Sequence, residues 1–570
     1  MAESLVRPSS AEAREGPSAS RLAEVFRWVL APALFALAAL AVAGTRHWPL
    51  AGDATLMHYG AFLLSHGFAP YRQIIDMNMP GCFLLDWGVI HVFGPGAAAW
   101  RIFDFALIGA AAAAVIVIAR PYDWFGGVFA AGFFFILHVH DGIDQAGERD
   151  LVLAVLMLLG CAAIFLALRR SSWAWSGIFG IASGAAMTIK PTAILWFPGM
   201  LVLAAAALQR RRRPMARHLL AACAGCAAPI AFIFVYLSHE DAASAFVQTV
   251  NGLMVYHAHI DRFPLRFLLT HLVPSALYPV IVLWLALAFA GRQWRTWEGA
   301  ALLWSIGVGV ASFVAQGKAF PYQRYPLEAF LLVPMGIDAA VGLRAARSRW
   351  RAFTAAALLG FATLALAPSW LIRADHYDWR HDDFTQSLTS DLNILGGPAL
   401  SGHVQCLDMT AGCLGVLYRM RLVQSTGFLY DCYFFHQPQT AVTERLREEF
   451  LEDMGHAPPE VLIESDQNCL GEPLGWGGLD AWPEFRLWRE ANYSLYVQRE
   501  PTRPIRWWPI AEQPPGYRIY VRKVNAPAAI AMLQEAATGS ASRTSAKTKP
   551  SRSTTSPLSM GIGSRKMGPA

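Results

Sequence analysis

The stretch "GDATLMHYGAFLLSHGFAPYRQIIDMNMPG" occupies residues 52–81 and directly follows an apolar run. Its second residue is Asp53, placed just after the segment 26–44, which is long enough to cross a bilayer. A carboxylate at such a point either caps the next helix or takes part in chemistry at the membrane surface. The choice between these roles depends on how the rest of the chain crosses the membrane.

The composition is that of a membrane protein. Of the 570 residues, 55% are hydrophobic and only 15% are charged, and the mean hydropathy is +0.34. These values are too apolar for a soluble multidomain protein and predict a polytopic membrane protein within a lipid bilayer. The net charge of +6 is modest, and most arginines lie in short clusters between apolar runs, which argues against nucleic-acid binding.

Eleven apolar stretches predict a mainly α fold, a bundle of about 11 transmembrane helices. After 26–44 they lie near 97–118, 122–139, 150–168, 173–189, 191–208, 218–237, 270–290, 298–315, 326–343 and 352–372. Basic residues gather at every second loop, as expected for cytoplasmic loops. They are Arg120, Arg169, Arg170, Arg210, Arg211, Arg212, Arg213, Arg217, Arg292, Arg295, Arg344, Arg347, Arg349 and Arg351. The segment 82–94 is either a membrane-parallel helix or a further partial crossing.

An odd number of crossings places the two ends of the chain on opposite sides of the membrane. We expect a cytoplasmic, disordered N-terminus over residues 1–25, a transmembrane domain over 26–374, a small exoplasmic α/β domain over 375–525 and a disordered tail over 526–570. Within the α/β domain, "QTAVTERLREEFLEDMG" has helical spacing, whereas "PEVLIES", "YSLYVQR" and "GYRIYVRK" indicate short strands.

The cysteines agree with this topology. Four of the eight, Cys406, Cys413, Cys432 and Cys469, lie in the predicted exoplasmic part, where disulfides can form in any of three pairings. Cys223 and Cys226 form a CxxC pair inside an apolar segment, without a second pair nearby. They are therefore interpreted as small buried residues and not as a metal site.

Polar side chains collect almost entirely in the predicted exoplasmic loops. They are Asp53, His58, Tyr71, Arg72, Asp76 and Asn78 in the first, Glu148, Arg149 and Asp150 in the second, and Lys190, Lys318, Tyr322 and Arg324 in later ones. Acids and cations that converge on one membrane surface suit a transfer reaction on a lipid phosphate. The acids can deprotonate or orient an acceptor hydroxyl, and the cations can hold the phosphate.

Each of these residues also has a structural interpretation. Asp53 and the acids at 148–150 could simply cap the helices that follow them. Lys318 and Arg324 could anchor the chain at the interface among tyrosines. Lys190 lies in an apolar background with no acid close in sequence, which favours a functional role. No cofactor is required, although the carboxylates could hold a divalent cation.

These motifs together resemble the GT-C glycosyltransferases, which include protein O-mannosyltransferases, the lipid A aminoarabinose transferase and rhizobial lipopolysaccharide galacturonosyltransferases. The resemblance rests on Asp53, "GFAPYRQIIDMNMPG", "FGPGAAAWR", "GERDLVLAVLMLLG", "IKPTAILWFPG" and "GKAFPYQRYPL", and it covers most of residues 26–523. Many members carry two adjacent acids at the end of the first helix, whereas Ala54 follows Asp53 here.

The resemblance implies a sugar donor linked to a polyprenyl phosphate and transfer outside the cytoplasmic membrane, in bacteria the inner membrane. The acceptor would be lipopolysaccharide, another glycan or a protein. Asp53 would be the catalytic carboxylate, assisted by Asp150 or Glu148, and Lys190, Lys318, Arg324 and Arg149 would face the donor phosphate. His58, Tyr71, Arg72, Asp76, Asn78 and Tyr322 would line the substrate loops.

Another function could use the same cationic sites without chemistry, namely transport of a lipid-linked saccharide by a transporter or flippase. Such a path should place polar residues near the midplane of several helices or show broken segments in two related halves. The charges instead crowd one surface, and no internal symmetry is visible. A role as a mere membrane anchor for the outer domain leaves the loop carboxylates and Lys190 unexplained.

Overall fold

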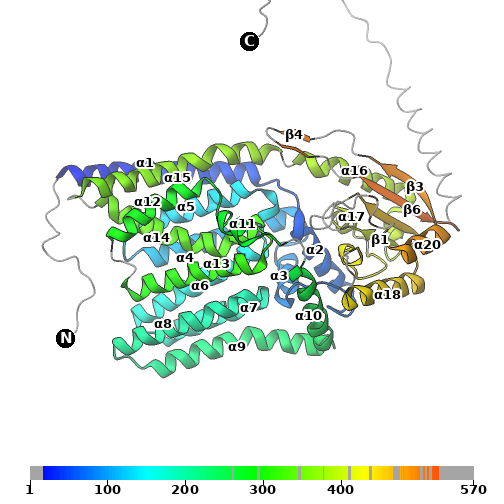
Figure 1. The fold of residues 1–570 in the computed structure, drawn as a ribbon, viewed down its shortest axis with the longest axis horizontal. Helices are drawn as coiled ribbons and strands as arrows, with labels where there is room; N and C mark the ends of the chain where they lie inside the picture. The colour runs from blue at the N-terminus through cyan, green and yellow to red at the C-terminus, as the bar shows by residue number, and fades with distance from the viewer. Residues whose placement is uncertain are drawn as a thin grey trace, which may run out of the picture.

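The computed structural model describes residues 17–524, apart from 260–261, 292–294, 345–347, 377, 409–411, 436–439, 467–475, 477, 479–480, 501–504, 508–509 and 513–515. A bundle of long helices occupies one part of the molecule, and a C-terminal domain, residues 378–524, lies at one end of it (Figure 1). The predicted tail over 526–570 lies outside the described residues.

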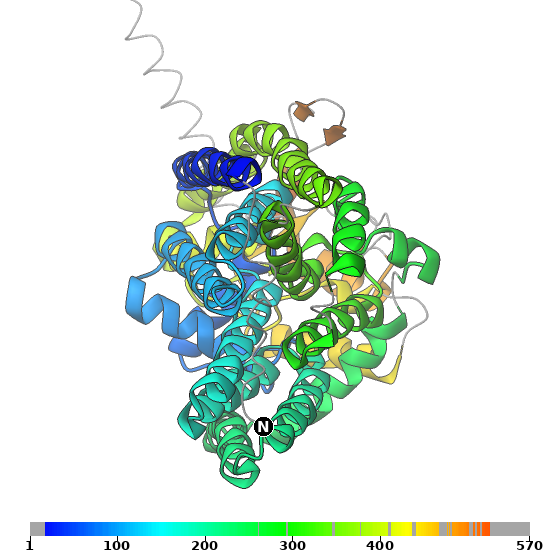
Figure 2. The ribbon, with the colours of Figure 1, turned by 90° about the vertical axis from the view of Figure 1, so that its left-hand side faces the viewer.

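The bundle is built from the segments that the hydropathy pattern marks. Its helices are α1 (Pro17–Thr45), α4 (Ala97–Ala119), α5 (Trp124–Asp141), α6 (Arg149–Arg170), α7 (Trp173–Ile189), α8 (Trp196–Arg210), α9 (Met215–His239), α12 (Leu277–Ala290), α13 (Trp297–Gln316), α14 (Tyr325–Arg344) and α15 (Arg349–His376). In the described part of the chain, eight helices are long and apolar enough to cross a membrane. Figure 2 looks along the bundle and shows the helices packed side by side.

The outer surface of the bundle is apolar. Large side chains such as Trp28, Phe35, Phe232, Phe289 and Phe353 are more than half exposed, whereas α6 and α14 are almost wholly buried at its centre. An exposed apolar surface of this extent belongs in hydrocarbon. The chain is a multi-pass membrane protein, and the exact number of crossings stays a prediction.

Two predicted boundaries differ from the structure. α1 begins at Pro17, earlier than the predicted start at residue 26. The predicted segment 270–290 is helical only from Leu277, where α12 begins, after the short α11 (Leu265–Thr270). Pro274 lies between the two helices, and proline in a helix interior removes a hydrogen bond and clashes with the preceding turn.

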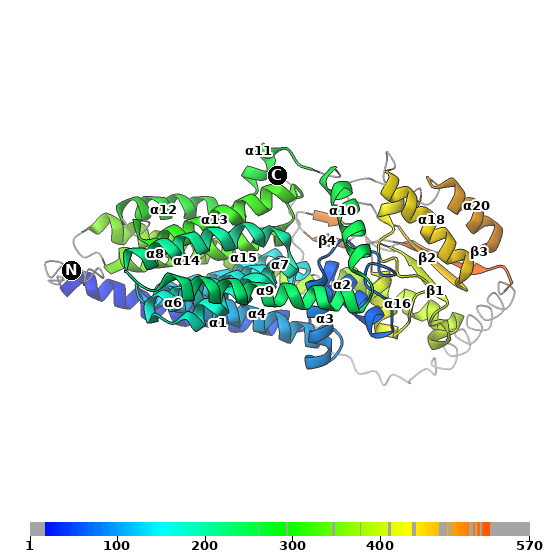
Figure 3. The same cartoon turned by 90° about the horizontal axis from the view of Figure 1, so that it is seen from below.

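Four shorter helices lie outside the bundle, namely α2 (Gly52–Ser65), α3 (Pro80–Phe93), α10 (Ala243–His259) and α11. Of these, α2, α3 and α10 lie between the bundle and the C-terminal domain, and α11 lies next to the end of α13 (Figure 3). α2 starts at Gly52, whose φ of 55° suits glycine, and ends before Gly67, with φ of 87°. α3 is the segment with two predicted interpretations; its 14 residues form one helix that starts with Pro80.

The C-terminal domain has a four-stranded sheet in the order β1-β2-β6-β3. The strands are β1 (Val404–Leu407), β2 (Val461–Ser465), β3 (Tyr493–Arg499) and β6 (Tyr517–Arg522), and β4 (Ile505–Trp507) with β5 (Ile510–Glu512) forms a separate pair. β1 and β2 are parallel and the other neighbours antiparallel. The helices are α16 (Asp378–Leu395), α17 (Cys413–Met420), α18 (Ala441–His456) and α20 (Pro483–Asn492). All three predicted strands are present, whereas β1, β4 and β5 were not predicted.

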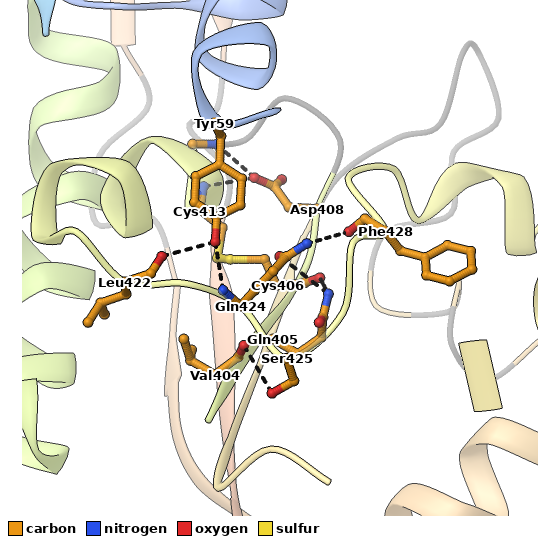
Figure 4. The surroundings of a disulfide bond; sticks show 11 residues. Tyr59, Val404, Gln405, Cys406, Asp408, Cys413, Leu422, Gln424, Ser425 and Phe428 are labelled. Atoms are coloured by element: carbon orange, nitrogen blue, oxygen red, sulfur yellow. Dashed lines mark hydrogen bonds between the residues drawn. A yellow bond between two sulfur atoms is a disulfide. The ribbon is translucent and has the colours of Figure 1, made fainter. Parts of the chain in front are cut away.

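One disulfide joins Cys406 on β1 to Cys413 at the start of α17 (Figure 4). Between them, the Asp408 side chain accepts hydrogen bonds from the backbone N–H groups of Gly412 and Cys413, at 3.1 and 2.7 Å. Cys432 is also disulfide-bonded, and Cys469 lies outside the described residues. Cys223 and Cys226 are free thiols, so the CxxC pair is not oxidised. Cys226 is buried as predicted, whereas Cys223 is exposed on α9, so the prediction of burial is wrong for Cys223.

Candidate active site

Asp53 lies in the first turn of α2 and forms an ion pair with Arg149, the first residue of α6. Both side chains are largely buried, with 17% of Asp53 and 22% of Arg149 exposed. Low solvent exposure strengthens such a pair relative to one at the surface. The carboxylate is therefore held by a residue from the second predicted loop and does not act only as a helix cap.

Two hydrogen bonds from side chains of α4 fix the loop before Arg149. The Asp104 Oδ1 atom accepts a hydrogen bond from the Gly147 backbone N–H at 2.6 Å, and the Trp100 indole N–H donates to the Ala146 carbonyl at 2.8 Å. Gly147 has φ of 68°, and a Cβ atom there would lie 2.4 Å from the Trp100 ring. Only glycine fits this position, so the loop geometry that presents Arg149 is set by the sequence.

Glu148 caps α6 and is almost fully buried. Burial raises the pKa of its carboxyl well above the ordinary value, and the negative charges of Asp53 and Asp150 raise it further, while Arg149 opposes the shift. These influences favour the protonated form, in which Glu148 can donate a hydrogen bond.

Lys190 pairs with Asp150 across the ends of α7 and α6. Its Nζ atom lies 2.8 Å from Oδ1 and 2.6 Å from Oδ2 of Asp150, and 2.6 Å from Oε1 of Gln316. The chain is extended at Lys190 because Pro191 disfavours a helical conformation in the residue before it. The lysine that has no acid close in sequence thus has one close in space.

A series of buried hydrogen bonds between polar side chains joins four helices. His138 on α5 lies 2.6 Å from Tyr325 Oη and 3.1 Å from Asp104 Oδ2, and Asp104 also accepts from Arg101 at 2.5 Å. Arg101 donates in turn to Thr45 on α1. Arg101 and Asp104 are three residues apart on α4 and form an ion pair there. Because Asp104 also holds the Gly147 amide, this chain supports the loop that carries Arg149.

The first predicted loop folds back on itself. Asp76 is fully buried and accepts hydrogen bonds from the Met77 backbone N–H at 2.7 Å and the Asn78 side chain at 2.6 Å, and the Tyr71 hydroxyl donates to the Asn78 carbonyl at 2.5 Å. Burial raises the pKa of Asp76 to about 6, even though these hydrogen bonds and the charge of Arg149 lower it. The loop is ordered by its own polar residues.

Three predicted site residues have contacts away from the Asp53 ion pair. His58 is buried on α2, with its Nδ1 atom 2.7 Å from Asp86 of α3. Arg72 is half exposed and faces Asp241, at 3.7 Å. Arg324 donates from Nε to the His271 carbonyl, at 3.0 Å, next to α11. These contacts stabilise local structure.

Other residues approach the site, and two of them were not predicted. Tyr322 lies within electrostatic range of Asp53 and Arg149, and Lys318 is buried near His257 of α10. Burial and the charges of Lys318 and Arg149 lower the pKa of His257 to about 3, so its imidazole is neutral. Tyr430 of the C-terminal domain also lies near Asp53. Neither His257 nor Tyr430 stands in a polar cluster in the sequence, so no pattern marks them.

The arrangement can bind an anion beside the carboxyl group of Asp53. The Nε–H group of Arg149 is buried, and the described residues offer it no hydrogen-bond acceptor, so it can bind an oxygen of a ligand. Within the described residues, no three His, Cys, Asp or Glu side chains are grouped so that they could hold a metal ion.

Comparison with protein-family models finds no match, and comparison with curated protein sequences finds none either. Among solved structures, the chain is similar to ArnT from Cupriavidus metallidurans, with 14% identity over 87% of this chain. It covers 98% of ArnT bound to undecaprenyl phosphate, with a TM-score of 0.50, and 97% of the apo form, with a TM-score of 0.51. The fold is of the GT-C type.

The archaeal oligosaccharyltransferase AglB from Archaeoglobus fulgidus, in complex with an inhibitory peptide and a dolichol-phosphate, is also similar. Its identity is 13%, the match covers 85% of this chain and 75% of that chain, and the TM-score is 0.49. The predicted GT-C fold, a membrane helix bundle with a small α/β domain, is thus confirmed by the likeness to ArnT. A structural similarity at 14% identity shows the fold alone, so the chemistry must be argued from the residues of the candidate site.

Proposed function

We propose that this protein is an integral-membrane glycosyltransferase that moves a sugar from a polyprenyl-phosphate donor to a cell-envelope acceptor. The observation that carries the proposal is the ion pair between Asp53 and Arg149, placed beside the Lys190–Asp150 pair at one end of a GT-C bundle. In this proposal a base for a hydroxyl lies next to cations for a phosphate. The similar ArnT structure contains undecaprenyl phosphate, a donor carrier of this class.

In the proposed reaction, Asp53 accepts the proton of an acceptor hydroxyl. The hydroxyl oxygen attacks the anomeric carbon of the sugar from the side opposite the phosphate, which inverts that carbon. The bond between this carbon and the phosphate oxygen breaks, and the polyprenyl phosphate leaves with the electron pair. Arg149 orients the carboxylate, because a guanidinium fork fixes the plane of a carboxylate that it binds.

The donor phosphate would bind to Arg149, Lys190 and Lys318. Arg149 has an unused Nε–H group, and Lys190 can exchange the neutral Gln316 oxygen for a charged phosphate oxygen while it keeps Asp150. Charge-assisted hydrogen bonds are roughly twice as strong as neutral ones, which favours this exchange. Arg324 is left out of this set because its described contact is with His271.

We place the site on the exoplasmic face of a bacterial inner membrane, with the N-terminus in the cytoplasm and the C-terminal domain in the periplasm. The alternation of arginine-rich loops supports this orientation. The disulfide between Cys406 and Cys413 supports an oxidising compartment for the C-terminal domain. The acceptor would be lipopolysaccharide, another glycan or a protein.

The experiment compares envelope glycans and glycoproteins by mass spectrometry in cells that have or lack the protein. Cells without it should lack one sugar on one acceptor, and the wild-type protein should restore that sugar. Asp53→Asn should not restore it, although it inserts into the membrane normally. Asp241→Asn is the matched control, because Asp241 is an exposed carboxylate at the surface. Restoration by Asp53→Asn would refute the role of Asp53 and favour a transporter.

A further inference from the structure

A cavity of about 270 Å³, which we call the lateral cavity, lies between α12, α13 and α14. In the described residues, α12 and α13 both pack on α14 but make little contact with each other, which leaves this space between them. The lining is almost entirely apolar and includes Trp284, Leu285, Phe289, Leu302, Leu303 and Ile337. Phe289 is 80% exposed, so the cavity opens on the apolar outer surface of the bundle, where lipid chains lie.

The lateral cavity lies at the end of the bundle opposite the candidate active site. Its lining residue Thr296 caps the start of α13, whereas Gln316, at the other end of that helix, bonds to Lys190. The 20 residues of α13 span about 30 Å, which is roughly the thickness of the hydrocarbon core. A ligand in the lateral cavity therefore leaves Asp53 and Arg149 free for other chemistry.

Two charged side chains meet beside the cavity where α12 ends. Asp338 lines the cavity, and its Oδ2 atom accepts a hydrogen bond from the Trp284 indole N–H at 3.0 Å. A Cβ atom at Gly291 would lie 3.7 Å from Oδ1 of Asp338 and 3.8 Å from Nη2 of Arg351, so the guanidinium group lies close to the cavity. The Arg351 Nε–H group is buried and has no acceptor among the described residues. An oxygen of a bound ligand would satisfy it.

The same end of the bundle is basic. Arg295 is exposed directly before the cap of α13, and Arg344 is the last residue of α14. Asp123 binds two arginines at once, Arg27 and Arg344, so this group keeps a net positive charge. Together with Arg351, these cations favour an anion at the mouth of the lateral cavity. Basic pockets between transmembrane helices bind the headgroups of anionic lipids.

We propose that the lateral cavity binds one anionic phospholipid. An acyl chain fills the apolar space between α12 and α13, and a phosphate oxygen accepts a hydrogen bond from the Arg351 Nε–H group. A zwitterionic lipid offers the same phosphate but brings a cation toward Arg295 and Arg344, so it binds more weakly. The bound lipid completes the packing between the two helices. This inference does not depend on the proposed function, because no residue of the candidate active site takes part.

The test measures lipid binding to the purified full chain in detergent by native mass spectrometry. The anionic lipid is phosphatidylglycerol and the zwitterionic one is phosphatidylcholine. The wild type should bind phosphatidylglycerol about tenfold more tightly than phosphatidylcholine. Arg351→Gln should lower the phosphatidylglycerol affinity about tenfold, the cost of one charge-assisted hydrogen bond. Arg217→Gln is the matched control, because Arg217 is an exposed arginine near the start of α9, which does not pack on α12 or α13.

A second variant tests the acyl-chain part of the site. Ala288 lines the cavity, so Ala288→Trp fills it and should lower the phosphatidylglycerol affinity at least about tenfold. Val282→Trp is its control, since Val282 is 65% exposed on the same helix and does not line the cavity. Thermal unfolding of each variant identifies misfolding, and the two variants change different helices, so one stays informative if the other misfolds.

Wild-type affinity for phosphatidylglycerol in Arg351→Gln or in Ala288→Trp would overturn the proposal. An equal loss in Arg217→Gln would also overturn it, because the lipid would then respond only to the overall surface charge. Titration with undecaprenyl phosphate separates the two lipid classes. If Ala288→Trp weakens undecaprenyl phosphate binding as much as phosphatidylglycerol binding, the cavity holds an isoprenoid chain and the phospholipid assignment is wrong.

Discussion

Lys190 and Asp150 form a bidentate ion pair although 40 positions separate them in sequence, with Nζ 2.6 and 2.8 Å from the two carboxylate oxygens. Asp150 is fully buried, so removal of this partner would leave a buried carboxylate without its ion pair. The sequence assigned these two residues to different roles, Asp150 as an assisting acid and Lys190 as a phosphate ligand, whereas the structure joins them in one ion pair.

Replacement of Lys190 should affect stability and donor binding separately. Lys190→Ala leaves the buried Asp150 charge without its partner and should lower the free energy of unfolding by about 3 kcal/mol. It should also weaken undecaprenyl phosphate binding about tenfold. The double variant Lys190→Ala/Asp150→Asn should regain stability but not binding, measured by thermal unfolding and by titration with the lipid. Arg324→Ala serves as the cation control. Recovery of binding in the double variant would mean that Lys190 only neutralises Asp150.

The buried Asp76 makes stability depend on pH. Its pKa is raised from 3.8 to about 6, so the folded state binds the proton more tightly than the unfolded state. Its contribution is therefore fully present below about pH 4 and is lost as the pH rises through about 6, with a total of roughly 3 kcal/mol. The unfolding temperature of the wild type should fall relative to that of Asp76→Asn between pH 4 and pH 6.5. Parallel pH curves for the two proteins would contradict this assignment.

Gly147 should tolerate no side chain. Gly147→Ala combines an unfavourable positive φ with a clash against Trp100, and should cost about 3 kcal/mol and reduce transfer, since the loop presents Arg149. Gly67→Ala is the matched control: φ is also positive, at 87°, but nothing lies within 4 Å of the added Cβ. It should cost only about 1 kcal/mol. Equal unfolding temperatures for the two variants would show that the Trp100 contact does not limit the loop.

The disulfide between Cys406 and Cys413 should stabilise the face of the C-terminal domain that packs on α2. The bond closes a short loop, with a sequence separation of 7, and its loss should cost about 2 kcal/mol. The variant with both cysteines changed to serine should unfold at a lower temperature than the wild type. A reductant should lower the unfolding temperature of the wild type by more than that of the variant. If the reductant acts equally on both, the stabilisation has another source.

The sequence predicted the elements better than their contacts. Hydropathy predicted the bundle helices because the backbone N–H and C=O groups of an apolar run in a membrane must form hydrogen bonds within that run. The alternation of apolar and polar residues predicted β3 and β6. β1 was missed because "VQCL" is short and includes the buried polar Gln405, whose side chain bonds to Thr426 and Gln424. Pro274 delays the start of α12 to Leu277, and the apolar composition of segment 270–290 did not indicate this later start.

The candidate site was predicted as a set of residues but not as pairs. The assignment of the loops to one side of the membrane predicted that five residues would gather at one end of the bundle, namely Asp53, Glu148, Arg149, Asp150 and Lys190. The ion pairs among these residues could not be predicted, because they depend on how helices far apart in the chain pack together. The contact between the C-terminal domain and α2 was missed for the same reason, since Tyr59 looks like an ordinary aromatic residue in sequence.

The hydrogen bond between Tyr59 and Gln424 joins residues 365 positions apart. During synthesis the ribosome completes the helix of Asp53 long before it makes the segment that anchors that helix. A chain that stops after the bundle therefore carries Asp53, Arg149 and Lys190 but lacks the segment whose backbone bonds to Tyr59 on α2. The anchor of α2 can therefore form only after the C-terminal domain has been made, so the order of synthesis leaves the helix of Asp53 without this contact until the end.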